Sequence, residues 1–157
     1  MTNETHEYTA RVVWDGNTGE GTARYAGYQR AYRVLAAGKP ELEGSADPAF
    51  RGDASKHNPE DLFLASISAC HMLFYLALCA LEGVRVIAYE DDAHGSMAMD
   101  ADGGGRFVEV LLRPRVVVSA DSDVGVAEAL HAVAHARCFI ANSCSVPIRH
   151  EASILVA

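Results

Sequence analysis

The stretch NPEDLFLASISACHMLFYLALCALEG, from Asn58 to Gly83, contains a long run without charge. From Leu62 to Leu81 there are twenty residues and not one Asp, Glu, Lys or Arg. A helix can begin cleanly before this run, because Asn58 can cap it and Pro59 suits the first helical position. Gly83 is a suitable stop. The stretch therefore predicts one long helix, apolar on nearly all sides, with a cysteine and a histidine near its middle.

The length of this run raises the question of a membrane span. Twenty uncharged residues can just cross a hydrocarbon core about 30 Å thick. Four polar side chains interrupt the run, however, and acidic residues rather than Lys or Arg flank it. There is no aromatic belt and no second span. We therefore expect no membrane partner, and we expect a partner chain to cover part of the helix, because a small domain seldom surrounds a helix completely.

Length and composition are those of a globular protein. The 157 residues are 50% hydrophobic and 22% charged, which favours one domain over residues 1–157. Thirteen Lys and Arg against 21 Asp and Glu give a net charge of −8, and no basic cluster stands out, so no nucleic-acid partner is expected. The N-terminal MTNETHEYTA is polar and acidic, unlike a secretory signal. A cytoplasmic location with reduced cysteines is expected.

The elements on either side of the long helix predict the fold class. Pro114 indicates that the strand containing it lies at a sheet edge or carries a bulge. Because the order lacks regular βαβ alternation, the class is α+β. The expected elements are a strand in 7–16, one broken or two short strands in 21–36, an irregular connection over 37–57, the long helix, a hairpin of 84–100 and 106–120, a second helix from Ser122 or Asp123 to about Cys138, and a last strand over 148–156.

Cys70 is the first residue that could carry chemistry. Buried structural thiols are usually inert. Cys70 lies about three turns into its helix, beyond the first-turn reach of the helix dipole. A reactive Cys70 therefore needs a cation from elsewhere in the chain. The candidates are the arginines of the N-terminal half, Arg24, Arg30, Arg33 and Arg51.

A second cluster lies in the sequence HAVAHARC. His131, His135 and Cys138 share one face of the predicted second helix. This spacing suits a zinc site, with Cys144 as a fourth ligand. Two histidines four residues apart are common by chance, and neither HExxH nor a paired CxxC supports them. A metal-binding module that uses these residues is an alternative to Cys70 chemistry.

The segment NPEDLFLASISAC resembles the N-P-E-x-L…A-x-x-A-C segment of the OsmC/Ohr family, the osmotically inducible and organic hydroperoxide resistance proteins. The order of strands, helices and cysteines is similar over nearly the whole chain. The resemblance implies an OsmC-like fold, with antiparallel sheets around two long helices. It also implies an interwoven homodimer with active sites at the subunit interface.

The resemblance implies roles for particular residues. Cys70 matches the cysteine that attacks peroxide, and Glu60 matches the glutamate that pairs with an arginine in that family. Arg51 lies where the OsmC branch has its active-site arginine, and Arg24 lies where the Ohr branch has one. Glu60 and Cys70 are ten residues apart, about 15 Å along one helix, so they cannot touch directly. The implied homodimer resolves this separation, because its active sites lie at the subunit interface.

The second cysteine departs from the family pattern. The family often reads C-P-x-S at the end of the second helix, whereas this chain reads CFIANSCSVP. Cys138 matches the resolving cysteine, with Phe139 in place of proline, and Cys144 is the alternative. His135, one turn before Cys138, is a candidate base for its proton.

The implied activity is that of a cysteine-based hydroperoxide reductase. Cys70 would become a sulfenic acid, Cys138 would condense with it to a disulfide, and a dithiol reductant, for example of the lipoyl type, would reset the enzyme. An apolar wall of Leu62, Phe63, Leu73 and Phe74 would favour organic hydroperoxides. No cofactor is expected. The alternative within the same fold is a non-enzymatic redox sensor or a protein that binds an apolar ligand.

Overall fold

Helix α1, Pro59–Leu81, forms where the sequence predicts it. The side chain of Asn58 accepts the backbone N–H of Asp61 at 2.8 Å, and the Asp61 carboxylate accepts the N–H of Asn58 at 3.2 Å. This reciprocal pair closes the first turn, where Glu60 and Asp61 also favour the positive end of the helix dipole. Gly83 follows the last turn with a φ of 75°, which a residue without Cβ adopts freely. Both predicted ends of the helix are confirmed.

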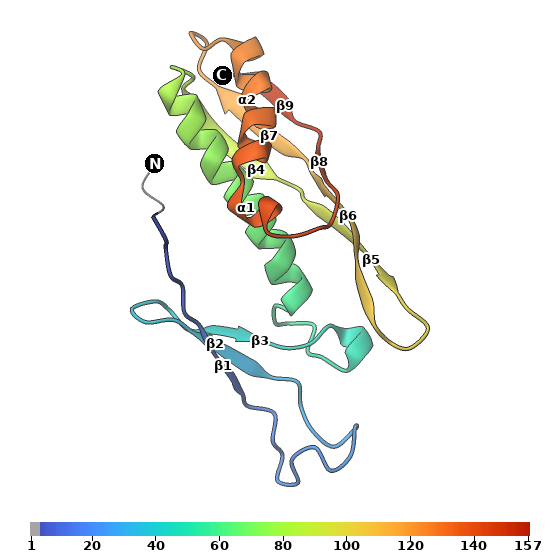
Figure 1. Ribbon diagram of the computed structural model, residues 1–157. Coiled ribbons are helices and arrows are strands. Elements are labelled where there is room, and N and C mark those ends of the chain that lie inside the picture. The colour runs from blue at the N-terminus through green and yellow to red at the C-terminus, as the bar shows by residue number, and fades with distance from the viewer. Residues whose placement is uncertain (1–3) are drawn as a thin grey trace. The chain divides into compact units, whose positions relative to one another are not determined.

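The computed structural model describes residues 4–157 (Figure 1). The chain falls into two compact units, of which the first ends at Leu62 and the second runs over Phe63–Ala157. The boundary lies within the first turns of α1. The expectation of a single domain over residues 1–157 stays a prediction.

The N-terminal unit is built on a three-stranded antiparallel sheet. Its strands are β1 (Arg11–Trp14), β2 (Tyr32–Leu35) and β3 (Leu42–Gly44), in the order β1-β2-β3, and a short helix, η1 (Pro48–Phe50), follows. The prediction for 21–36 is wrong in extent, because only β2 forms there. The connection predicted as irregular contains β3 and η1. Gly44 belongs in β3 because the ring of Tyr32 lies over it, where a Cβ would come within 2.2 Å of a ring carbon.

The second unit contains the predicted hairpin and the predicted last strand. Each arm of the hairpin is divided into two shorter strands, and so is the last strand. The strands are β4 (Val86–Asp91), β5 (His94–Met99), β6 (Gly105–Leu112), β7 (Pro114–Val118), β8 (Ile148–His150) and β9 (Ser153–Val156). They form two three-stranded sheets, β4-β7-β9 and β5-β6-β8. The hairpin pairs are antiparallel, but β8 and β9 run parallel to β6 and β7. The α+β class is confirmed, with mixed rather than wholly antiparallel sheets in this unit.

Pro114 lies in a central strand and not at an edge, so the edge expectation is wrong. The proline is the first residue of β7, directly after the break at Arg113, where a missing N–H costs no ladder bond. The Arg113 N–H donates to one oxygen of Asp91 at 2.7 Å, and Ser68 of α1 donates to the other at 2.5 Å. One carboxylate therefore stabilises the strand break and ties α1 to β4.

Helix α2, Val124–Arg137, packs with α1 on one face of the sheet β4-β7-β9 (Figure 1). The side chain of Asp123 caps α2 by accepting the N–H of Val126 at 3.0 Å, as the sequence predicts. The hydroxyl of Tyr75 in α1 donates to the carbonyl of Ala127 in α2 at 3.0 Å. The shared core consists of Tyr75, Leu78, Cys79, Val84, Val116, Val118, Ala127, Leu130 and Ala134. This packing fixes the face of α2 that meets α1.

Helix α1 is long and apolar enough to cross a membrane by length and composition, a test that the core helix of a soluble protein also passes. Only 28% of its most apolar window is buried within the single chain. Leu73 is 63% exposed and Leu81 is 80% exposed. A row of apolar side chains on α1 is thus left uncovered by the other residues of the described range 4–157.

Candidate active site

The thiols of Cys70 and Cys138 meet at the junction of three helices. Cys70 projects from α1, while Cys138 ends α2 and caps the short helix α3 (Phe139–Asn142). The Cys138 sulfur accepts the N–H of Ala141 at 3.5 Å, and the Cys70 thiol lies close enough to raise the pKa of Cys138. Two cysteines 68 positions apart in the sequence are therefore brought together in one unit.

Their surroundings give the two thiols different character. Cys138 is 1% exposed, whereas Cys70 is partly exposed. Burial, and to a smaller degree the neighbouring Cys70 thiol, raise the pKa of Cys138 to about 11, against the opposing effect of the Ala141 N–H. Cys138 is thus a protonated thiol at neutral pH, and Cys70 is the member of the pair that a small molecule can reach. The expectation that His135 activates Cys138 is wrong, because the pKa of Cys138 is raised and the His135 ring packs against His150.

The other two cysteines lie in different surroundings. Cys79 is buried beside Tyr75, and burial raises the pKa of its thiol. Cys144 is partly exposed, and its thiol donates to the carbonyl of Ala141 at 3.5 Å. All four cysteines are free thiols. The proximity of Cys70 to Cys138 favours Cys138 over Cys144 as the partner of Cys70.

Phe139, which stands where the family motif has proline, packs against Phe74. The two rings meet edge to face with centroids 4.8 Å apart. Phe74 lies one turn after Cys70 on α1, and Phe139 directly follows Cys138. The aromatic pair therefore holds the two cysteine-bearing segments together. Of the other predicted wall residues, Phe63 packs against Phe107 at 4.9 Å, Leu73 is exposed, and Leu62 belongs to the N-terminal unit.

Two buried histidines form a pair that the sequence did not predict: His71, which directly follows Cys70, and His131, named above only as a candidate metal ligand. Nε2 of His71 and Nδ1 of His131 share a hydrogen bond of 3.0 Å, and the rings are parallel with centroids 5.3 Å apart. Tyr75 stacks on His131 at 3.9 Å, and His150 of β8 lies 5.6 and 5.9 Å from the two rings. Within residues 4–157, the second nitrogen of each paired imidazole has no hydrogen-bond partner. Burial lowers the pKa of His71 to about 4 and that of His131 to about 3.

The metal alternative finds no support in this geometry. His131 is hydrogen-bonded to His71, His135 packs against His150, and Cys138 lies near Cys70. Among the described residues, no group of three or more His, Cys, Asp or Glu side chains could hold a metal ion.

The four candidate arginines differ in how far they are already engaged. Arg33 forms ion pairs with Asp15 and Glu41, and Arg24 pairs with Glu20 at 3.5 Å on an exposed surface. Arg30 lies over the rings of Tyr25 and Tyr28, 4.6 and 4.0 Å from their centroids. Arg51 is exposed, caps η1 with a φ of 67°, and forms no ion pair within residues 4–157.

Arg51 and Arg30 line the same cavity of about 290 Å³ in the N-terminal unit, together with Lys56 and Asp53. Glu60 forms no ion pair with Arg51 within the described chain, so the predicted pairing of these two residues is not made there. The structure thus places Cys70 beside Cys138 and leaves Arg51 and Glu60 as predictions.

A family model described as OsmC-like protein matches residues 52–152. The chain belongs to this family. The match includes Glu60, Cys70 and Cys138 and begins one residue after Arg51. The assignment of Arg51 therefore has no support from the matched range.

Solved structures of OsmC-like proteins share the fold of the chain. An OsmC-like protein of unknown function from Vibrio cholerae is 30% identical, with a TM-score of 0.85 over 95% of this chain and 100% of that one. An organic hydroperoxide resistance protein from Elizabethkingia anophelis is 18% identical, with a TM-score of 0.69 over 99% of each chain. One from Bacillus subtilis is 22% identical, with a TM-score of 0.63 over 93% of this chain and 98% of that one. No curated protein matches the chain.

The buried histidine pair makes the stability of this OsmC-like protein depend on pH. The pKa values of His71 and His131 are lowered in the folded state, so the unfolded chain binds more protons once the pH falls below about 6.5. Stability is therefore present above pH 6.5 and is lost on acidification. We expect the free energy of unfolding to fall by up to about 2 kcal/mol per histidine between pH 7 and pH 5. Urea unfolding at a series of pH values measures this slope.

The matched control replaces both histidines by glutamine, which keeps polar side chains but cannot titrate. The double variant should lose most of the slope between pH 5 and pH 6.5, a window above the usual range of carboxylates. A wild-type stability that does not change over this window would contradict the account.

Proposed function

We propose that this protein is a thiol peroxidase that reduces organic hydroperoxides, with Cys70 as the attacking cysteine and Cys138 as the resolving one. The observation that carries the proposal is the proximity of a partly exposed Cys70 to a buried Cys138 at the end of α2. An attacking thiol must be reachable by substrate, and a resolving thiol must lie near it and give up its proton as it attacks. Family membership and the hydroperoxide resistance proteins with the same fold support this reading.

The chemistry takes place at two sulfur atoms. The Cys70 thiolate attacks one oxygen of the hydroperoxide, the O–O bond breaks, and the leaving alkoxide takes up a proton to become an alcohol. Cys70 is then a sulfenic acid. The Cys138 sulfur attacks the Cys70 sulfur, and the hydroxyl group leaves as water with the Cys138 proton. A dithiol reductant then exchanges with the disulfide and restores both thiols.

Arg51 and Glu60 have a role in the proposal that rests on the family resemblance. A guanidinium is always charged and could bind both the thiolate and the departing oxygen, while Glu60 would orient it. Arg30 is a second candidate, because it lines the same cavity as Arg51 and forms no carboxylate pair within residues 4–157. Arg24 is a weaker candidate, because it is exposed and already pairs with Glu20.

The apolar surroundings support an organic rather than an aqueous substrate. Phe74 and Phe139 pack beside the two cysteines, and apolar surface favours substrates with apolar groups. A non-enzymatic sensor or a protein that binds an apolar ligand is the alternative. The N-terminal unit has a largely apolar cavity of about 520 Å³, lined by Trp14, Tyr32 and Leu62 among others, that could serve such a ligand.

We further propose that the protein works as a cytoplasmic homodimer. The uncovered apolar side chains of α1, Leu73 and Leu81 among them, support a second copy as the cover. Sedimentation equilibrium at micromolar concentration should give twice the chain mass of 16.8 kDa. A folded monomer at that concentration would contradict the dimer but not the cysteine chemistry.

Replacing Cys70 by serine should abolish peroxide consumption and sulfenic acid trapping, because the serine hydroxyl is not ionised at neutral pH. Cys79→Ser is the matched control, since Cys79 lies on the same helix but is buried beside Tyr75. Its activity should remain close to wild type. Peroxide consumption with a dithiol reductant measures both variants. Full activity in Cys70→Ser would rule out the proposed peroxidase.

Mild oxidation should link Cys70 to Cys138 within one chain. Cys79 is nine residues from Cys70 on the unbroken α1, about 13 Å away, while the Cα atoms of a disulfide lie within about 7 Å. Peptide mapping after one equivalent of an alkyl hydroperoxide identifies the pair. A Cys70–Cys144 peptide as the main product would move the resolving role to Cys144, and the absence of any disulfide would favour a one-cysteine mechanism.

A further inference from the structure

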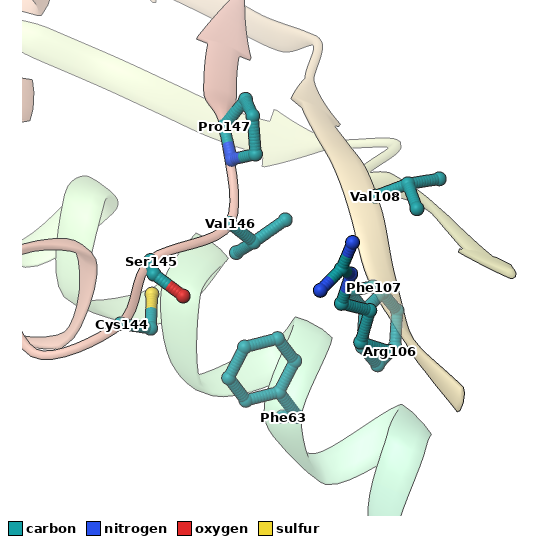
Figure 2. A pocket seen from close by; sticks show the side chains of 8 residues that line it. All are labelled: Phe63, Arg106, Phe107, Val108, Cys144, Ser145, Val146 and Pro147. Atoms are coloured by element: carbon teal, nitrogen blue, oxygen red, sulfur yellow. The ribbon is translucent and has the colours of Figure 1, made fainter. Parts of the chain in front are cut away.

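A cavity of about 480 Å³ lies in the second unit between α1, β6 and the connection that leads from α3 to β8 (Figure 2). Its volume is within the range of small-molecule sites. Neither Cys70 nor Cys138 lines it. The residues that line the cavity are Phe63, Arg106, Phe107, Val108, Cys144, Ser145, Val146 and Pro147.

The cavity combines an apolar wall with one guanidinium. Phe63 and Phe107 pack at 4.9 Å, and Val146 and Pro147 extend the apolar surface. Figure 2 shows the side chain of Arg106 reaching from β6 toward Phe63 and Val146. Such a site suits a molecule with an apolar group next to an anionic one.

Arg106 differs from the arginines around it. Arg113, Arg115 and Arg149, in or beside the same sheets, each pair with a carboxylate. Within residues 4–157, Arg106 forms no ion pair, in a chain with a net charge of −8. Its guanidinium is therefore free to bind a ligand carboxylate, in the bidentate geometry that arginine favours.

The cavity also contains a thiol that the proposed peroxidase chemistry does not use. Cys144 lies across the cavity from Arg106, on the connection after α3 (Figure 2). It is partly exposed, unlike the buried Cys79 and Cys138. A thiol in a cavity that binds a ligand is positioned to react with a ligand that carries an exchangeable sulfur.

We propose that this cavity is a modification site for small organic disulfides that carry a carboxylate beside an apolar group. Arg106 holds the carboxylate, and Cys144 exchanges with the disulfide. The Cys144 thiolate attacks one ligand sulfur, a protein–ligand S–S bond forms, the ligand S–S bond breaks, and the second half leaves as a thiolate. Cys144 is oxidised and the released half is reduced. The site rests on the cavity alone and does not require the proposed peroxidase activity.

The test compares two aromatic disulfides on the Cys70→Ser chain, in which Cys144 is the one remaining cysteine that is not buried. Ellman's reagent carries a carboxylate on each ring, whereas dipyridyl disulfide is uncharged at neutral pH. Both release a coloured thiol. We expect both to label Cys144, and we expect Arg106→Gln to slow Ellman's reagent by about tenfold while dipyridyl disulfide changes little, because a charge-assisted hydrogen bond is lost.

Two control variants separate a specific contact from general charge. Arg137→Gln removes the same charge from an exposed residue outside the cavity and should leave both rates unchanged. Arg106→Lys keeps the charge without the planar fork and should recover part of the rate. Peptide mapping assigns each adduct, and on the wild-type chain it gives the rate at Cys144 even if the Cys70 variant folds poorly. Absence of label at Cys144, equal slowing of both reagents, or equal slowing by Arg137→Gln would overturn the proposal.

Discussion

The proximity of Cys70 to Cys138 is the constraint on which the rest of the second unit depends. It requires α1 to hold Cys70 in place while α2 ends at Cys138, and both conditions follow from packing. Tyr75 joins the helices by donating to Ala127, and the shared core fixes which faces meet. The aromatic contact of Phe74 with Phe139 adds a second tie directly beside the thiols. A proline at position 139 would not supply this ring, so the departure from the family motif has a structural use.

The same packing gives the two sulfurs unequal chemistry. Cys138 is buried at a helix junction, which raises the pKa of its thiol, whereas Cys70 is partly exposed. The neighbouring imidazoles of His71 and His131 are also buried, and their lowered pKa values keep them neutral near pH 7. No positive charge therefore reaches the cysteines from this histidine pair. The candidates for the cation that the proposed chemistry needs remain the arginines of the N-terminal half, as in the sequence analysis.

Local signals in the sequence predicted the helices well. Asn58, Gly83 and Asp123 determine helix ends through their own backbone and side-chain geometry, so no distant contact is needed to find them. Long-range pairing was harder to predict. Strand β3 depends on its register with β2 and on Tyr32 covering Gly44, and the place of Pro114 depends on β9, which follows it by almost forty residues. The contact of His71 with His131 spans 60 positions and has no local pattern. The roles of Cys70 and Cys138 were implied by the resemblance to the family motif, and they stay predictions.

The central claim is that this OsmC-like protein turns over as a peroxidase, rather than reacting once as a sensor. Steady-state consumption of an alkyl hydroperoxide with a lipoyl-type dithiol, compared with a monothiol and with hydrogen peroxide, tests it most directly. The account predicts many turnovers per chain, faster with the dithiol and with the alkyl hydroperoxide. Consumption that stops after one equivalent of peroxide per Cys70, with the dithiol in excess, would contradict it.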